Sequence, residues 1–228
     1  MKLGEEQNQT LWQDEVLAQT LKEDGGASLA AYRAWREDRE RVLREGARPE
    51  VEVFLASQAT EDPPREAASV EFVAVGIPAA AKPRTVAGKR FGALVHAVLR
   101  DVALDATREA VRKTTELNAR VLGASVEEAE AAGAAVQSAL AHPVFARARA
   151  APRRHREYPV TLRLEEGKMM EGVVDLAFVE DGAWVVVDFK TDADGAERRT
   201  QYQRQLRWYA YALTRLTGME SRAVLLGI

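Results

Sequence analysis

Two short apolar runs near the C-terminal end of the chain carry charged residues at regular positions. The runs are VVDLAF and WVVVDFK, and the tetrapeptide Glu-Asp-Gly-Ala lies between them. Its central pair, Asp181-Gly182, is a strong signal for a two-residue hairpin turn. Counting back from this turn along both predicted strands places Asp175 opposite Asp188.

The two faces of this predicted hairpin differ in polarity, because side chains alternate across a strand. One face is entirely apolar and is predicted to be a wall of the core: Val174, Leu176, Phe178, Val185, Val187 and Phe189. The other face carries Val173, Asp175, Ala177, Val186, Asp188 and Lys190. Two carboxylates roughly 5 Å apart at Cβ repel each other. A fold keeps such a pair when a cation lies between the acids, so the pattern predicts a metal site.

The hydrophobic pattern predicts helices and strands along the rest of the chain. Helical spacing covers residues 9–24 and 27–45 and begins again at Phe91. A further helix is predicted after the capping box formed by Ser125 and Glu128, and a long helix is predicted at 197–217, ended by Gly218. Strands are predicted at 51–57, 69–75, 157–164 and 169–179, at 184–190, and in the final RAVLLGI. This order of elements favours an α/β domain with a mixed central sheet flanked by helices.

We predict a domain boundary near residue 86. The small-residue connector GIPAAAKPRTVAGKR separates an N-terminal extension, residues 1–86, from the domain that carries the charged hairpin, residues 87–228. The extension contains both helical and strand patterns, and its function is not legible from them.

Composition narrows the class of protein. The chain is 46% hydrophobic and 29% charged, which is typical of a soluble globular protein. It has no cysteine, so disulfides, zinc-thiolate sites and iron–sulfur clusters are excluded. There is no apolar signal segment at the N-terminus and no apolar run of about 18 residues. We therefore expect a cytoplasmic protein with no membrane partner.

The positions of the charged residues along the chain are more informative than its net charge. The net charge of −3 and pI near 5.8 do not mark a nucleic-acid binder. However, five arginines occur within ten positions just before a predicted strand: Arg147, Arg149, Arg153, Arg154 and Arg156. Such a cluster is either a solvated surface or a contact for phosphates. Because it leads into the sheet with the acids, we predict that Arg153, Arg154 and Arg156 contact the phosphates of a nucleic acid.

The acids on the hairpin suit a hard divalent ion, which takes carboxylate, carbonyl and water oxygens. Asp175 and Asp188 supply the two carboxylates, and the backbone carbonyl of Phe189 is a third oxygen. Lys190 then lies near the substrate, where an ammonium group offsets charge that develops on a phosphate. The alternative is that Asp188 and Lys190 form a surface ion pair without chemistry.

His96 is a further candidate metal ligand. It lies outside the apolar stripe of its predicted helix, and Gly92 is one turn earlier, which leaves space beside the imidazole. Imidazole suits manganese and other transition metals. The alternative is a histidine that only packs against its neighbours or faces solvent.

Polar residues also recur on the long helix predicted at 197–217. Gln205 and Tyr209 are one turn apart and form a patch able to hold a lysine or a phosphate, whereas Tyr202 lies on a nearby face. Glu157, at the start of a strand, either hydrogen-bonds to an active-site group or pairs with the neighbouring arginines. An aromatic packing stripe is the alternative for the tyrosines.

Together these residues resemble the RecB-type branch of the PD-(D/E)XK nuclease superfamily. The matching positions, in chain order, are Gly92 and His96, Glu157, Gly172 and Asp175, Asp188-Phe-Lys190-Thr-Asp192, and Tyr202, Gln205 and Tyr209. The match spans roughly residues 88–228. It is most similar to the C-terminal nuclease domain of AddA/RecB-like helicase–nucleases of the UvrD/Rep class.

The resemblance implies a restriction-endonuclease-like core and metal-dependent hydrolysis of DNA. It implies Mg²⁺ or Mn²⁺ at His96, Asp175, Asp188 and the carbonyl of Phe189. Lys190 becomes the catalytic lysine together with Gln205 and Tyr209, and Glu157 and Tyr202 are supporting residues. The N-terminal extension is similar to the linker that such proteins carry between motor and nuclease.

The resemblance also implies partners. The sequence contains no Gly-x-x-x-x-Gly-Lys-Ser/Thr, so a helicase motor is expected either in cis, in a longer protein, or in trans. The expected substrate is DNA, delivered as a single strand during double-strand-break repair. Two alternatives stay open: a non-catalytic nuclease-fold module that binds DNA or anchors a partner protein, and a stand-alone RNA or repair nuclease.

Overall fold

The structure, a computed structural model, describes residues 27–47, 49–64, 69–75, 88–165, 167–192 and 196–228. The helix expected at residues 9–24 lies outside these ranges. The chain divides into two compact units, Met1–Glu50 and Val51–Ile228. In the first unit, helix α2 (Ala27–Gly46) is exposed, with ion pairs one turn apart such as Arg41–Glu45 at 3.0 Å. Tyr32 and Trp35, also exposed, contact each other on this helix.

The second unit is built on a six-stranded mixed sheet among the described residues, with the order β1-β4-β5-β6-β2 and β3 paired to β4. The strands are β1 (Glu52–Leu55), β2 (Val70–Ala74), β3 (Arg154–Arg163), β4 (Lys168–Glu180), β5 (Ala183–Lys190) and β6 (Ser221–Gly227). Strand β4 is antiparallel to β3 and β5, whereas β5, β6 and β2 are parallel to one another. The expected mixed α/β architecture is therefore confirmed.

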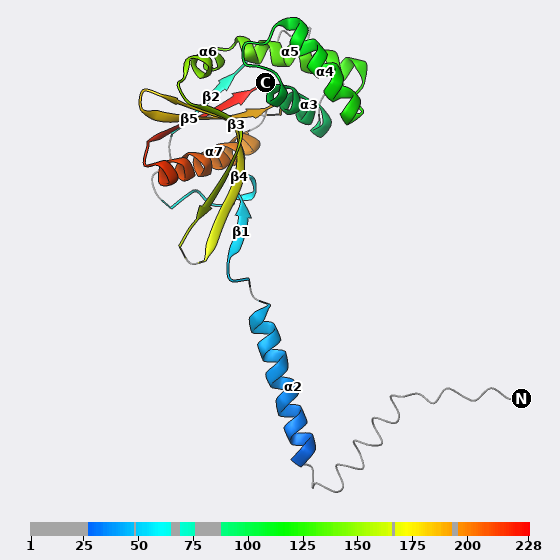
Figure 1. The fold of residues 1–228 in the computed structure, drawn as a ribbon, viewed down its shortest axis with the longest axis vertical. Helices are drawn as coiled ribbons and strands as arrows, with labels where there is room; N and C mark the ends of the chain where they lie inside the picture. The colour runs from blue at the N-terminus through cyan, green and yellow to red at the C-terminus, as the bar shows by residue number, and fades with distance from the viewer. Residues whose placement is uncertain (1–26, 48, 65–68, 76–87, 166, 193–195) are drawn as a thin grey trace, which may run out of the picture. The chain divides into compact units, whose positions relative to one another are not determined.

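Helices cover both faces of the sheet (Figure 1). On one side lie α3 (Lys89–Asp101), α4 (Arg108–Leu122), α5 (Val126–Ala141) and α6 (Pro143–Ala150), and on the other lies α7 (Ala196–Thr217). Each side has its own buried cluster, one around Phe145 and Phe189 and one around Leu206 and Leu213. This is the three-layer arrangement that the order of predicted elements favours.

Local signals in the sequence set several element ends. Ser125 and Glu128 form the predicted capping box at the start of α5. Gly218, with φ of 71°, follows the end of α7, and its N–H donates to the carbonyl of Thr214. In the hairpin, Asp181 and Gly182 have φ of 50° and 75°, as a type I′ turn requires. The predicted register is also found, since pairing runs from Glu180–Ala183 to Leu176–Val187.

The assignment of hairpin faces was wrong at Val174. Leu176 and Phe178 pack under the α3–α6 layer as expected, but Val174 belongs to the α7 cluster, like Ala177. The alternation breaks between Val174 and Leu176, where the paired strand β3 contains Glu157 with φ of 46°. The second face is also a core wall, because α7 buries Ala177 and Val186 completely.

The division of the chain differs from the boundary expected at residue 86. Strand β1 pairs with β4, and β2 pairs with β6, so both belong to the sheet of the second unit. The hydrogen bonds of a strand need a partner that is distant in sequence, and the connector at 76–87 gave no sign of that pairing. No helix among the described residues is long and apolar enough to cross a membrane.

Candidate metal centre and active site

Asp188 lies near the end of β5, between the two helical layers, and its side chain is only 2% exposed. Its Oδ2 atom is 2.6 Å from Nζ of Lys190, and Nε2 of Gln205 approaches Oδ1 at 3.4 Å. Burial, and then the charge of Asp175, raise the pKa of Asp188 to about 6, against the opposing effect of Lys190. This carboxylate therefore lacks enough partners to offset its desolvation.

Asp175 stands on β4 one residue beyond the last pair of the β4–β5 ladder, Leu176–Val187. Its Oδ2 accepts the backbone N–H of Phe189 at 2.7 Å, and its Oδ1 is 3.4 Å from Nδ1 of His96. One carboxylate thus joins β5 to the imidazole on α3. The carboxyl groups of Asp175 and Asp188 are close enough for one charge to shift the pKa of the other, as the predicted register requires.

His96 reaches the same place from helix α3. Its side chain is 30% exposed, and Nε2 lies 3.0 Å from the carbonyl oxygen of Phe189. Burial lowers the pKa of His96, but the hydrogen bond and charge of Asp175 outweigh it, so the net shift is upward. The space at Gly92 is used differently from the expectation: a Cβ there would lie 3.1 Å from Oγ1 of Thr191. The lack of a side chain at Gly92 therefore makes room for Thr191, the residue after Lys190, and not for the imidazole of His96.

Glu157 completes a group of three possible metal ligands. One ligand atom each from His96, Glu157 and Asp175 lie within 4.8 Å of one another. Burial, and then the charge of Asp175, raise the pKa of Glu157. Its positive φ costs on the order of 1–3 kcal/mol for a residue other than glycine. Strain of this kind at a cluster of acids is typical of a functional site.

Lys190 is held from two sides. Its Nζ contacts Asp188 and lies 5.0 Å from the ring centroid of Tyr202. Tyr202 in turn donates its hydroxyl to Oδ1 of Asp192 at 2.8 Å. Asp192 was not among the predicted site residues, although it stands in the motif Asp-Phe-Lys-Thr-Asp, and that motif was the signal that could have identified it.

Gln205 and Tyr209 lie on the buried face of α7, directly below Asp188. The Nε2 atom of Gln205 donates to Oη of Tyr209 at 3.0 Å and is also near Asp188. Tyr209 packs on Gly172 so tightly that a Cβ at that position would be 2.4 Å from Cε1 of the ring. Gly172, noted in the sequence only as part of a motif, is therefore required for the position of Tyr209.

Of the three arginines predicted to bind DNA, only Arg156 is close to this cluster, where its charge opposes the rise in the pKa of Glu157. Arg156 donates to the carbonyls of Leu99, at 3.0 Å, and of Val102 at the C-terminal end of α3. Arg154 donates to the carbonyl of Arg149, and Arg153 lies over the ring of Trp184. In the folded chain these arginines contact backbone carbonyls and an aromatic ring of other helices and strands. Their sequence positions did not show these partners.

The donor set fits a divalent metal ion. Asp188 Oδ2 is buried with the ammonium of Lys190 at 2.6 Å, and a carbonyl oxygen, an imidazole and a second carboxylate face the same space. Oxygen-rich sites with one imidazole suit magnesium and manganese. The residues that lie together here are His96, Glu157, Asp175, Asp188, the carbonyl of Phe189, Lys190, Gln205 and Tyr209.

Comparison with known proteins gives one family match and two shorter similarities. The profile of the PD-(D/E)XK nuclease superfamily matches residues 69–228. An ATP-dependent helicase/nuclease subunit from Alkaliphilus metalliredigens is 43% identical over 61 residues, which is 25% of this chain and 5% of that protein. A protein of the same name from Clostridium botulinum is 33% identical over 66 residues, 28% of this chain and 5% of that protein. The chain thus matches about one twentieth of the length of these curated relatives.

Proposed function

The chain belongs to the PD-(D/E)XK nuclease superfamily, and on that premise we propose that it is a divalent-metal-dependent deoxyribonuclease domain. The observation that carries the proposal is the convergence of His96, Asp175 and Asp188 on the peptide of Phe189, with Lys190 at 2.6 Å from Asp188. Proteins of this superfamily generally use divalent metal ions, and the ligand types here suit Mg²⁺ or Mn²⁺.

Four groups would hold the ion: the imidazole of His96, the carboxylates of Asp175 and Asp188, and the carbonyl of Phe189. Glu157 is close enough to be a further ligand. When bound, a divalent ion polarises a phosphoryl oxygen and activates water for attack. The chain's own contribution is to present these ligands on two strands and one helix that packing holds rigid.

Lys190 supplies positive charge at the reacting phosphate. Burial lowers its pKa, but the charges of Asp188 and Asp175 raise it more, so the ammonium form is favoured. An ammonium group that is already in position stabilises negative charge that develops on a phosphate in the transition state. Gln205 and Tyr209 form the floor beneath Asp188 and fix the orientation of its carboxylate.

We further propose that the domain is the nuclease part of an ATP-dependent helicase–nuclease that acts in double-strand-break repair. Two curated relatives carry the name helicase/nuclease, and the match covers only a small part of each. In that setting the motor, in the same polypeptide or in a partner, would deliver a single strand to the metal centre. Exonuclease action on single-stranded DNA is the expected form of cleavage.

A cleavage assay with a matched lysine control tests the proposal. Linear single-stranded DNA is incubated with the parent, Lys190→Ala or Lys113→Ala, each with Mg²⁺, Mn²⁺ or EDTA. Lys113 is exposed on α4 and pairs with Glu109 at 3.5 Å. We expect metal-dependent cleavage that falls at least a hundredfold in Lys190→Ala and is unchanged in Lys113→Ala. Neither cleavage nor metal binding by calorimetry would instead favour the non-catalytic DNA-binding or anchoring module, whereas metal binding without cleavage would mean that the domain needs a motor to load its substrate.

A further inference from the structure

Helix α3 exposes a narrow stripe of residues on the side that carries His96. Lys89, Ala93 and Arg100 are exposed and His96 is half-buried, whereas Leu94, Val95, Val98 and Leu99 face the core. At 3.6 residues per turn, Lys89, His96 and Arg100 fall within about 40° of one another around the helix axis. We name these residues, Lys89, Ala93, His96 and Arg100, the α3 stripe.

We propose that the α3 stripe is the surface that holds the DNA strand, with phosphates on Lys89 and Arg100 on either side of the metal centre. The inference rests on the proposed function and adds to it the residues that contact the strand. Lys89 lies about 10 Å before His96 along the helix axis, and Arg100 about 6 Å after it. A strand bound to both cations therefore passes over the possible metal ligand His96. Ala93 has only a methyl group, so no long side chain stands between Lys89 and the metal centre.

Arg100 is exposed at the rim of the site, and one of its guanidinium nitrogens is not used in its ion pair. Its side chain is 53% exposed, and its Nε and Nη2 atoms contact the adjacent Asp101 at 2.8 and 3.2 Å. The Nη1 atom has no hydrogen bond within the described part of the chain. The hydrogen bond with Asp101 is the largest effect that raises the pKa of Arg100, and the charge of Glu157 adds a smaller effect in the same direction.

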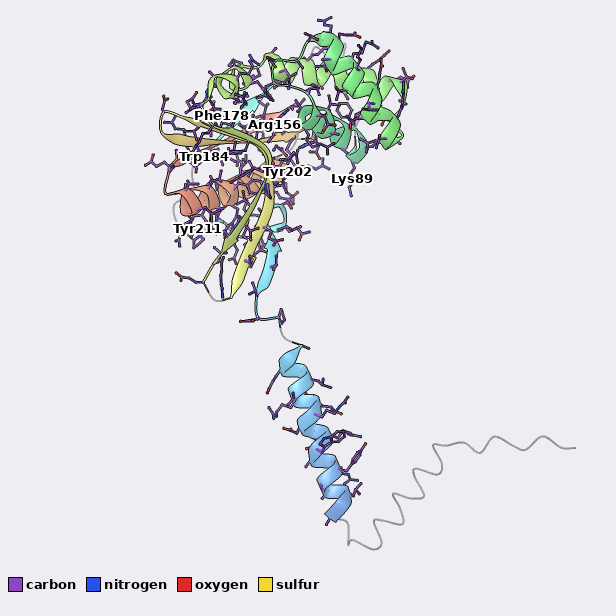
Figure 2. The ribbon with its side chains drawn as sticks, viewed as in Figure 1. Lys89, Arg156, Phe178, Trp184, Tyr202 and Tyr211 are labelled. Atoms are coloured by element: carbon purple, nitrogen blue, oxygen red, sulfur yellow. The ribbon has the colours of Figure 1, made fainter. Side chains whose placement is uncertain are left out.

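Lys89 is not explained by the stability of its helix. It is the first residue of α3, where the positive end of the helix dipole disfavours a cation. It forms no ion pair with any described residue, and Figure 2 shows it projecting outward from the end of α3. A phosphate of the strand is a partner for Lys89 that the described residues do not supply.

Arg90 provides the contrast. It is adjacent to Lys89 but points about 100° away around the helix, where it pairs with Glu128 of α5 at 2.9 Å. This ion pair joins α3 to α5, whereas the ion pair of Arg100 is with the adjacent residue Asp101. Arg90 therefore serves as a control that removes one positive charge from the same helix without touching the α3 stripe.

The test measures binding of a fluorescent single-stranded oligonucleotide in EDTA, so that the strand is not cut. Lys89→Ala, Arg100→Ala, the double variant and Arg90→Ala are compared with the parent over a range of salt concentrations. Each lost phosphate contact should reduce the slope of log K against log salt by about 0.7 and weaken binding about fivefold at 0.1 M salt. We expect a reduction of about 1.4 in the double variant and none in Arg90→Ala.

Cleavage kinetics with Mg²⁺ separate holding of the strand from chemistry. In the double variant KM should rise and kcat should stay within about twofold of the parent, because neither side chain contacts the reacting group. If the parent cleaves DNA but the double variant binds with the same slope as Arg90→Ala, the inference about the α3 stripe is wrong and the proposed function stands. A parent that neither binds nor cleaves DNA overturns both. Thermal unfolding of each variant verifies that it is folded.

Discussion

Asp175 accepts the backbone N–H of Phe189 through Oδ2 at 2.7 Å, so an acid on β4 is fixed to the peptide that follows Asp188 on β5. The carbonyl oxygen of Phe189, in the next peptide group, lies 3.0 Å from Nε2 of His96. A single residue of β5 therefore connects the helix with the strands that carry the proposed ligands. The geometry of the metal centre depends on the backbone of Phe189 as much as on the side chains.

Replacement of Asp175 tests that relationship. In Asp175→Asn the amide oxygen still accepts the N–H of Phe189, whereas Asp175→Ala leaves this buried donor without a partner. An unsatisfied buried N–H costs about 1–3 kcal/mol, so the alanine variant should be less stable than the asparagine variant by that amount. The measurement is urea unfolding in EDTA. Both variants should lose divalent-metal binding and cleavage, and equal stabilities would show that the hydrogen bond contributes nothing.

Gly172→Ala should destabilise the protein by about 1–3 kcal/mol. The added methyl group would be 2.4 Å from the ring of Tyr209, which is buried and cannot move away easily. Gly133→Ala on α5 is the control, because its new Cβ would be 3.6 Å from Oγ1 of Thr115, an ordinary contact. That helical substitution should be neutral or stabilising by about 0.5–1 kcal/mol. Thermal unfolding compares the two, and an equally stable Gly172→Ala would contradict the tight packing.

Stability of the metal-free protein should fall as the pH rises from 5 to 7.5. Asp188 titrates at about 6 in the folded protein, above its ordinary value of 3.8, because burial and Asp175 disfavour its charge. Between these values the folded state binds more protons than the unfolded state, so the free energy of unfolding decreases with pH. His96 acts in the same direction: its pKa is raised, and its stabilising contribution is lost as the pH rises through the folded pKa.

The expected decrease is on the order of 1–2 kcal/mol, at 1.36 kcal/mol per pKa unit. Carboxylates with lowered pKa values, such as Glu180 beside Arg147, act below about pH 4.5 and leave this window unaffected. Urea unfolding in EDTA at several pH values measures the slope. In Asp188→Asn the decrease between pH 5 and 6 should be smaller than in the parent, because only groups such as Glu157 and His96 then contribute to it, and a slope equal to that of the parent would assign the effect to these other groups.

Arg156→Ala should cost about 1–3 kcal/mol, because it removes two hydrogen bonds from a charged donor to the carbonyls that end α3. Arg154→Ala, which removes one exposed bond to the carbonyl of Arg149, should cost less than about 1 kcal/mol. Neither variant should change the salt dependence of DNA binding. A reduced slope in Arg156→Ala, with unchanged stability, would return this residue to the role in DNA binding that its sequence position suggests.

The sequence by itself determined the parts of this protein that depend on neighbouring residues. The Asp181-Gly182 turn, the register of the β4–β5 hairpin and the capping box at Ser125 follow from conformational preferences that act over two to four residues. Because the register is local, the sequence also placed Asp175 level with Asp188. The order of weak motifs along the chain was enough to indicate the superfamily.

Only the tertiary structure decided the relationships between distant residues. His96 and Phe189 are 93 positions apart, and their contact depends on how α3 packs on the sheet. Near the site, the packing of whole elements also outweighs the alternation of side chains along a strand. There Glu157 has a positive φ, Val174 faces the α7 cluster and Arg156 turns toward α3. Strands β1 and β2 join the sheet for the same reason, since a strand gains its hydrogen bonds only from a partner that the local sequence does not specify.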